Sequence, residues 1–190
     1  KGLSLRDTSI DLIKKIISYD TTSRNSNLEL IHFIRDYLKD LGIESLLVHD
    51  DAGTKANLYA TLGPADRPGI LLSGHTDVVP IDGQDWHTDP FNVVEKDAKL
   101  FGRGTCDMKS FVAICLAYAP KFLERGLKIP IHFAFSHDEE VGCVGVRTLI
   151  AKLANEIQPK PMMCIVGEPT LMQVIIGHKG KMSYQCHVRG

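Results

Sequence analysis

Two short stretches far apart in the chain carry side chains of the types that bind divalent metal ions. The first holds His75 and Asp77, and the second is the acidic run at residues 138–140. Imidazole and carboxylate donors without cysteine are typical of catalytic zinc or cobalt sites, whereas structural zinc sites are commonly built on thiolates. These side chains therefore indicate a catalytic metal site, and the rest of the sequence must form elements that bring them together.

His75 follows an apolar run at residues 70–73 that predicts a short buried strand. Ligands of open α/β sheets bind beyond the carboxyl ends of the strands, which is the position that this pattern gives His75. Asp77, two residues later, could orient the second ring nitrogen of His75. An ordinary hydrogen-bonded histidine is the alternative, because a His-x-Asp pattern arises often by chance.

The acidic run follows another predicted core strand, at residues 129–136. Asp138, Glu139 and Glu140 come directly after it, and three packed carboxylates repel one another unless solvent or a cation offsets their charge. Val141 and Gly142 then indicate a turn from strand to helix. A metal site and a solvated acidic loop both fit this pattern.

Two more acids lie at comparable positions. Asp107 is in a glycine-punctuated turn that opens an apolar helix at residues 110–124, and Glu168 follows a predicted strand at residues 162–166. The candidate ligands His75, Asp107, Glu140 and Glu168 are separated by 32, 33 and 28 residues, about one βα unit each. This spacing favours one shared catalytic metal site over four unrelated loops.

The elements around these residues predict a three-layer α/β domain. An amphipathic helix is expected at residues 8–18 and a second at 28–41, where Gly42 gives a helix-ending signal. Strands are expected at residues 44–49 and 57–62. Alternating strands and helices of this kind pack helices on the faces of a sheet.

Composition sets limits on the function. The chain has 190 residues, 44% of them hydrophobic, and a formal net charge of −1. That charge provides no basic face for nucleic acid or an anionic membrane, and no apolar run approaches the length of a membrane helix. Five cysteines without a Cys-x-x-Cys pair favour a reducing compartment. We therefore expect a cytoplasmic protein without nucleic-acid or membrane partners.

Taken together, the motifs resemble those of the two-zinc amidohydrolases, a family that includes N-acyl amino acid deacylases, desuccinylases, aminoacylases and carboxypeptidases. The shared motifs are residues 73–80, Trp86 with residues 89–91, residues 102–104 with 107–109, residues 138–140 and residues 167–170. The resemblance spans most of the chain. It implies a three-layer αβα zinc-hydrolase catalytic domain with a mixed, mostly parallel sheet.

The resemblance also implies a ligand set. His75 and Glu168 would bind one zinc ion, Glu140 would bind a second, and Asp107 would bridge the two, with cobalt as an alternative metal. The peptide bond after the bridging Asp107 is often cis in this family.

Two more residues receive catalytic roles from the resemblance. Asp77 would orient His75. Glu139 would be the general base that activates a water held between the metal ions and later protonates the departing amine. A general base should not itself be a ligand, because a coordinated carboxylate is a poor base.

Within the family, residues 82–86, 138–143 and 178–181 most resemble the acetylornithine deacetylase branch. This implies hydrolysis of the N-acetyl amide of acetylornithine to ornithine and acetate, a step of arginine biosynthesis. The substrate class would be small N-acyl amino acids. A succinyl-diaminopimelate desuccinylase and another N-acyl-amino-acid or dipeptide hydrolase are the alternatives.

Family members are longer than this chain, which implies an N-terminal portion. Residues 1–177 would belong to the catalytic domain, and residues 178–190 would begin a lid or dimerisation domain. A further histidine ligand and the residues of the oxyanion site would lie beyond Gly190. The full-length form is expected to be a homodimer.

Two other function classes fit parts of the pattern. A two-carboxylate glycosidase could pair Asp107 with Glu139 or Glu140, but it would not need His75 or Glu168. A non-catalytic relative could keep the metal site and the fold without turnover. Activity that survives chelation of the metal would favour the glycosidase. An unchanged rate after replacement of Glu139 would favour the non-catalytic relative.

Overall fold

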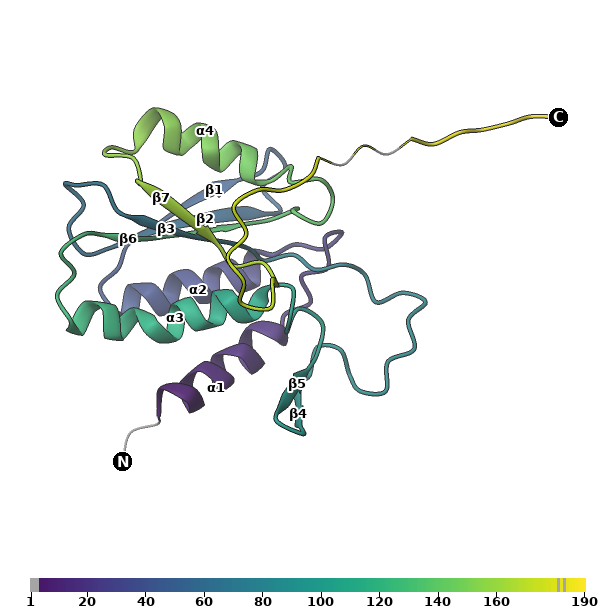
Figure 1. The fold of residues 1–190 in the computed structure, drawn as a ribbon, viewed down its shortest axis with the longest axis horizontal. Helices are drawn as coiled ribbons and strands as arrows, with labels where there is room; N and C mark the ends of the chain where they lie inside the picture. Colours follow the sequence, from purple (N-terminus) through teal and green to yellow (C-terminus); the bar gives the residue numbers. More distant parts are fainter. Residues whose placement is uncertain (1–3, 181, 183) are drawn as a thin grey trace.

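A mixed sheet lies between two helical layers in the computed structural model, which describes residues 4–180, 182 and 184–190 (Figure 1). The strands are β1 (Ser45–His49), β2 (Ala56–Leu62), β3 (Ile70–His75), β6 (Ile131–Ser136) and β7 (Met163–Val166). Their order across the sheet is β1-β2-β6-β3-β7. The sequence-based expectation of a three-layer α/β domain is confirmed.

Strand direction explains why the predicted site residues meet. β3 is parallel to both β6 and β7, whereas β2 is antiparallel to β1 and β6. In this register His75 lies opposite Ser136, and Ser73 lies opposite Val166. The three parallel strands therefore end at one edge of the sheet, where β3 ends at His75 and the acidic candidate residues follow β6 and β7.

The helices cover the sheet unequally. The helices α1 (Leu5–Ile17), α2 (Leu28–Asp40) and α3 (Lys109–Glu124) lie on one face, and α4 (Val146–Glu156) lies on the other (Figure 1). The first face contains the main core, because α2 and α3 bury apolar stripes against the sheet and α1 packs its own apolar stripe against α3. A smaller cluster under α4 joins Tyr59, Ala134 and Leu149.

Hydrogen bonds at its N-terminus determine where α1 begins. The Ser4 hydroxyl accepts a hydrogen bond from the Asp7 backbone N–H, and the Asp7 carboxylate accepts one in return from the Ser4 backbone. This capping box satisfies donors that a helix start would otherwise leave without partners. The helix consequently begins at Leu5, three residues before the expected start.

A two-stranded hairpin, β4 (Val94–Lys96) with β5 (Lys99–Phe101), was absent from the sequence-based expectation. Its strands are short and largely exposed, so they carry no strong hydrophobic periodicity. Asp97 and Ala98 form the turn with φ of 51° and 56°. Asn-Gly or Asp-Gly is the usual sequence for such a turn, and Asp-Ala gives a weaker signal.

The predicted boundary at residue 178 stays a prediction. From Leu171 onward, the described residues form neither helix nor strand, and most of their side chains are exposed. Residues 1–3 of the predicted catalytic domain, and Lys181 and Ser183 of the predicted second domain, lie outside the described residues. Within the described part of the chain, no helix has the length and hydropathy needed to cross a membrane.

His132 on β6 is a buried histidine away from the candidate site. Its Nδ1 lies 2.8 Å from the Tyr59 hydroxyl and 3.0 Å from the Thr61 hydroxyl. Its Nε2 is buried without a hydrogen-bond partner among the described residues. Burial lowers the pKa of His132, because a charged ring at this position would lose its hydration.

This burial predicts a pH-dependent loss of stability. As the pH falls below about 6.5, the unfolded chain binds a proton at residue 132 that the folded chain excludes, so the free energy of unfolding decreases. Urea denaturation should therefore show a shallower pH dependence between about pH 6.5 and 5 for His132→Asn than for the unaltered protein. The exposed residue His49 provides a control variant, His49→Asn. An unchanged slope in His132→Asn would contradict the prediction.

Candidate metal centre

His75 is at the carboxyl end of β3 and is almost completely buried, with 2% of its surface exposed. Its Nε2 lies 3.1 Å from Asp107 Oδ1, 3.7 Å from Glu168 Oε1 and 3.8 Å from Glu139 Oε2. One ring nitrogen of a buried histidine thus faces three carboxylates. This arrangement is the centre of the candidate site.

Each predicted ligand is placed by the element that it adjoins. Asp107 lies before the first turn of α3, Glu140 follows β6, and Glu168 follows β7. Gly167 packs against the ring of Phe111 on α3, and a Cβ at this position would collide with that ring. A glycine directly before Glu168 therefore lets β7 end close to α3.

The ligand atoms form two groups that share His75. One group joins His75 with Asp107 and Glu140, and the other joins His75 with Glu139 and Glu168. Within each group, the nitrogen and oxygen atoms lie within 4.8 Å of one another. The structure therefore brings together all four residues that the sequence predicts as ligands, together with the predicted base.

Asp77 connects the two halves of the site. Its carboxylate accepts hydrogen bonds from the backbone N–H groups of Glu139, at 3.0 Å, and Glu140, at 3.2 Å. The Ser23 hydroxyl donates a third hydrogen bond to the same carboxylate, at 2.7 Å. Asp77 thus fixes the backbone from which Glu139 and Glu140 project.

The contact between Asp77 and His75 differs in detail from the expectation. His75 Nδ1 is 2.9 Å from the backbone carbonyl oxygen of Asp77 and 3.6 Å from its carboxylate oxygen Oδ1. The nearer partner of the ring is therefore the backbone of Asp77. Either contact leaves Nε2 directed at the carboxylates, which is the orientation that a metal ligand needs.

In the candidate site, several carboxylates crowd around the imidazole ring of His75. Burial opposes protonation of His75, but the hydrogen bonds and charge of Asp77, with the charge of Glu168, raise its pKa to about 9. Partial burial and the charge of Asp107 raise the pKa of both Glu140 and Glu168. A cation among these groups would offset their mutual repulsion.

This donor set fits a divalent metal ion. It offers one imidazole nitrogen and several carboxylate oxygens, and the groups that the described residues form include no thiolate. Zinc, cobalt and manganese accept such ligands. Asp107, Glu139 and Glu168 remain partly exposed, so water and small molecules can reach the carboxylates.

Glu139 lies as close to His75 as the predicted ligand Glu168 does. Its other oxygen, Oε1, accepts a hydrogen bond from the Cys143 thiol at 3.3 Å. A carboxylate that borders the ligands without being one of them could exchange a proton with a nearby water. This geometry accommodates the base predicted at Glu139.

Two features beside Asp107 concern the start of α3. The peptide bond between Asp107 and Met108 is cis, as the family resemblance implies. Lys109 is fully buried, and its ammonium donates a hydrogen bond to the Tyr19 carbonyl oxygen at 2.8 Å. Burial lowers the pKa of Lys109 to about 7, against the opposing charge of Asp20. Burial of this lysine was not expected, because lysine side chains are normally exposed.

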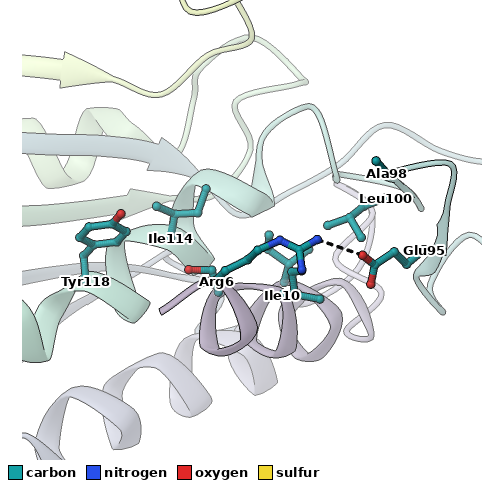
Figure 2. A pocket seen from close by; sticks show the side chains of 9 residues that line it. Arg6, Ile10, Glu95, Ala98, Leu100, Ile114 and Tyr118 are labelled. Atoms are coloured by element: carbon teal, nitrogen blue, oxygen red, sulfur yellow. Dashed lines mark hydrogen bonds and ion pairs between the residues drawn. The ribbon is translucent and has the colours of Figure 1, made fainter. Parts of the chain in front are cut away.

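A separate surface pocket of about 370 Å³ lies between α1, the β4–β5 hairpin and α3. Figure 2 shows Arg6 paired with Glu95 across it, with Ile10, Leu100 and Tyr118 along its wall. None of the six predicted site residues lines this pocket. The candidate chemistry is therefore located at the edge of the sheet.

Comparison with known proteins identifies two curated relatives that bear the same name. Acetylornithine deacetylase of Proteus mirabilis (strain HI4320) is 37% identical over 191 residues, covering 96% of this chain and 48% of the relative. Acetylornithine deacetylase of Shigella sonnei (strain Ss046) is 38% identical over 167 residues, covering 87% of this chain and 42% of the relative. The chain thus spans about half the length of these curated relatives.

Solved structures share the fold. Human carnosine dipeptidase 1 matches with a TM-score of 0.72 and 26% identity, over 85% of this chain and 38% of that protein. The M20 family metallo-carboxypeptidase Sso-CP2 from Sulfolobus solfataricus matches with a TM-score of 0.72 and 21% identity, over 84% of this chain and 37% of that protein. The sequence model of peptidase family M20/M25/M40 matches residues 71–187, which include every predicted site residue. With most of its length matched by that model, the chain belongs to peptidase family M20/M25/M40.

Proposed function

We propose that the protein hydrolyses the N-acetyl amide of N-acetylornithine to ornithine and acetate in a metal-dependent reaction. The observation that carries this proposal is the convergence of His75 with four carboxylates at one edge of the sheet. The two relatives named acetylornithine deacetylase, at 37% and 38% identity, support the choice of substrate.

In this proposal, His75 and Glu168 would hold one zinc ion and Glu140 would hold another, with the Asp107 carboxylate available to both; cobalt is the alternative metal. When bound, the metal ions supply Lewis-acid polarisation of the amide carbonyl and make an attacking water more acidic. His75 must present an unprotonated Nε2, so protons compete with the metal for this residue. The raised pKa of His75 makes that competition relevant at neutral pH.

Glu139 is the proposed general base. One of its carboxylate oxygens accepts a proton from the attacking water and then delivers it to the nitrogen of the departing amine. The thiol of Cys143 donates a hydrogen bond to the second oxygen, which restricts the rotation of the carboxylate. Proton transfer by a positioned side chain of this kind accelerates reactions by about 10²- to 10⁴-fold.

Asp77 is the proposed orienting residue. Its backbone carbonyl fixes the ring of His75, while its carboxylate holds the backbone N–H groups of Glu139 and Glu140. Through its backbone and its side chain, this one buried residue sets the position of a ligand from β3 and of the acidic turn after β6. A shift of either element would misplace the base relative to the metal ligands.

Dipeptide hydrolysis is a second candidate function. The fold is shared with human carnosine dipeptidase 1 at 26% identity. A peptide bond and an N-acetyl amide present the same carbonyl and the same leaving nitrogen to the site. A desuccinylase that acts on succinyl-diaminopimelate would use the same groups.

A substrate panel tests the proposal. We expect amine release from N-acetylornithine to show a higher kcat/KM than release from N-succinyl-diaminopimelate or carnosine, and we expect a chelator to abolish it. A higher kcat/KM for carnosine would transfer the assignment to the dipeptidases. Activity on a glycoside that survives chelation would favour the two-carboxylate glycosidase instead.

The expected cellular location, substrate class and partners of the protein stay predictions. They are a cytoplasmic location, a small N-acyl amino acid as substrate, a homodimer in the full-length form, and no nucleic-acid or membrane partner. The net charge of −1 supports the last expectation.

A further inference from the structure

Asp138 is the first of three consecutive acids, yet it belongs to neither group of candidate ligands. Its Oδ1 accepts a hydrogen bond from the Lys55 ammonium at 2.5 Å, and its Oδ2 lies 3.1 Å from His137 Nδ1. The side chains of Lys55 and Asp138 are both only 15% exposed. A lysine 83 residues away in the sequence thus engages the acid that does not join the site.

The Lys55 ammonium is also linked to Asp77, through Ser23. Lys55 Nζ donates a hydrogen bond to the Ser23 carbonyl oxygen at 2.5 Å. The Ser23 hydroxyl donates to Asp77 at 2.7 Å, and Asp77 accepts from the backbone of Glu139 and Glu140. A continuous series of hydrogen bonds therefore runs from Lys55 to the turn that carries the proposed base.

We infer that Lys55 and Ser23 are positioning residues that determine which acids of the run at 138–140 enter the metal centre. This inference rests on the proposed metal centre and adds residues that do not touch the metal ligands. Lys55 neutralises Asp138 and holds it on the outer side of the turn. Ser23 holds Asp77 against the turn, so that Glu139 and Glu140 face His75.

Charge explains why Lys55 is needed. Removing one partner of a partly buried ion pair leaves an uncompensated charge, which is strongly unfavourable. Asp138 without Lys55 would be one more carboxylate beside a site that already contains several. It would then compete with Glu140 for the metal, or push the turn away from His75 through like-charge repulsion.

Zinc affinity of Lys55→Met, measured by competition with a chromogenic chelator, tests the inference. We expect about a 10- to 100-fold weaker affinity than in the unaltered protein, the range typical of residues that orient metal ligands. The control is Lys121→Met, which removes an exposed pair with Glu124 at 2.9 Å and should leave zinc affinity unchanged. Equal affinity in Lys55→Met and the unaltered protein would overturn the inference.

A double variant separates positioning from general destabilisation. Adding Asp138→Asn to Lys55→Met removes the uncompensated charge, so zinc affinity should recover by about 10-fold or more relative to Lys55→Met alone. Failure to recover in a folded double variant would mean that Lys55 acts only on the fold, which contradicts the inference.

Ser23→Ala gives an independent route if Lys55→Met does not fold. It removes the hydrogen bond to Asp77 and should weaken zinc affinity by about 10-fold. The control is Ser18→Ala, at an exposed serine whose hydroxyl donates a hydrogen bond to the Lys15 carbonyl oxygen, and it should leave zinc affinity unchanged. Unchanged affinity in Ser23→Ala would count against the inference. If the unaltered protein itself binds no zinc, the proposed metal centre fails, and that result is distinct from each outcome above.

Discussion

Replacing Glu139 by glutamine is expected to lower kcat by about 10²- to 10⁴-fold while the protein retains its metal. The amide keeps the size of the side chain and its hydrogen bond with Cys143, but it cannot accept a proton from water at neutral pH. Because Glu139 is proposed to act only in proton transfer, KM should change much less than kcat. Steady-state kinetics on N-acetylornithine and zinc content, measured on the same preparation, check both parts.

The control for this prediction is Glu156→Gln on α4, where an exposed carboxylate pairs with Lys152 at 2.6 Å. That variant should retain both full activity and metal. Glu139 is also one of the groups close to His75 and Glu168, so a ligand role has a clear signature. Loss of zinc together with activity in Glu139→Gln would show that Glu139 is a ligand and would contradict its role as the base.

Asp107→Ala should weaken zinc binding by more than about 100-fold, beyond the 10- to 100-fold effect typical of residues that only orient ligands. Asp107 is the carboxylate nearest to His75 Nε2, at 3.1 Å, and it is the residue proposed to contact both metal ions. Its removal should therefore weaken both halves of the site at once and abolish turnover. Isothermal titration with zinc, at a pH where the unaltered protein is fully folded, measures the effect.

The matched control is Asp66→Ala, at an exposed aspartate whose only described ion pair is with its neighbour Arg67 at 2.8 Å. Circular dichroism and thermal unfolding of the metal-free proteins should show that both variants keep the fold. Zinc affinity in Asp107→Ala equal to that of the Asp66→Ala control would refute the proposed ligand set.

Local sequence was sufficient to predict where the site lies. The apolar runs before His75, before Asp138 and before Glu168 became β3, β6 and β7, because a short apolar run between turn residues is a strong and local signal for a strand, even in β7, where the side chains are exposed. Parallel pairing of these strands then brought their carboxyl ends to one edge. Positions at strand ends were therefore predictable without knowledge of any tertiary contact.

The roles within the acidic run were not predictable from the residues alone. Asp138, Glu139 and Glu140 have the same chemistry, and what separates them is contact with distant residues, Lys55 and Asp77. Lys55 precedes a strand by one residue, in a polar stretch that gives no sign of a role. Family resemblance assigned Glu139 and Glu140 their roles, and the structure adds a physical reason why Asp138 is set apart.

Ser23 was missed for a similar reason. It lies in a polar loop between α1 and α2, and such loops commonly contain serine. Its importance follows from its hydrogen bond to Asp77, 54 residues later in the chain. A contact of this range depends on the packed sheet and helices, and no periodicity in the sequence reports it.

The proposed function depends on a divalent metal held by His75, Asp107, Glu140 and Glu168. The most direct test is zinc content per chain, measured by plasma mass spectrometry after the protein has been loaded with zinc and dialysed against metal-free buffer. We expect at least about one zinc ion per chain in the unaltered protein, and close to none in Asp107→Ala. An unaltered, folded protein that retains no zinc after this treatment would contradict the proposed metal centre.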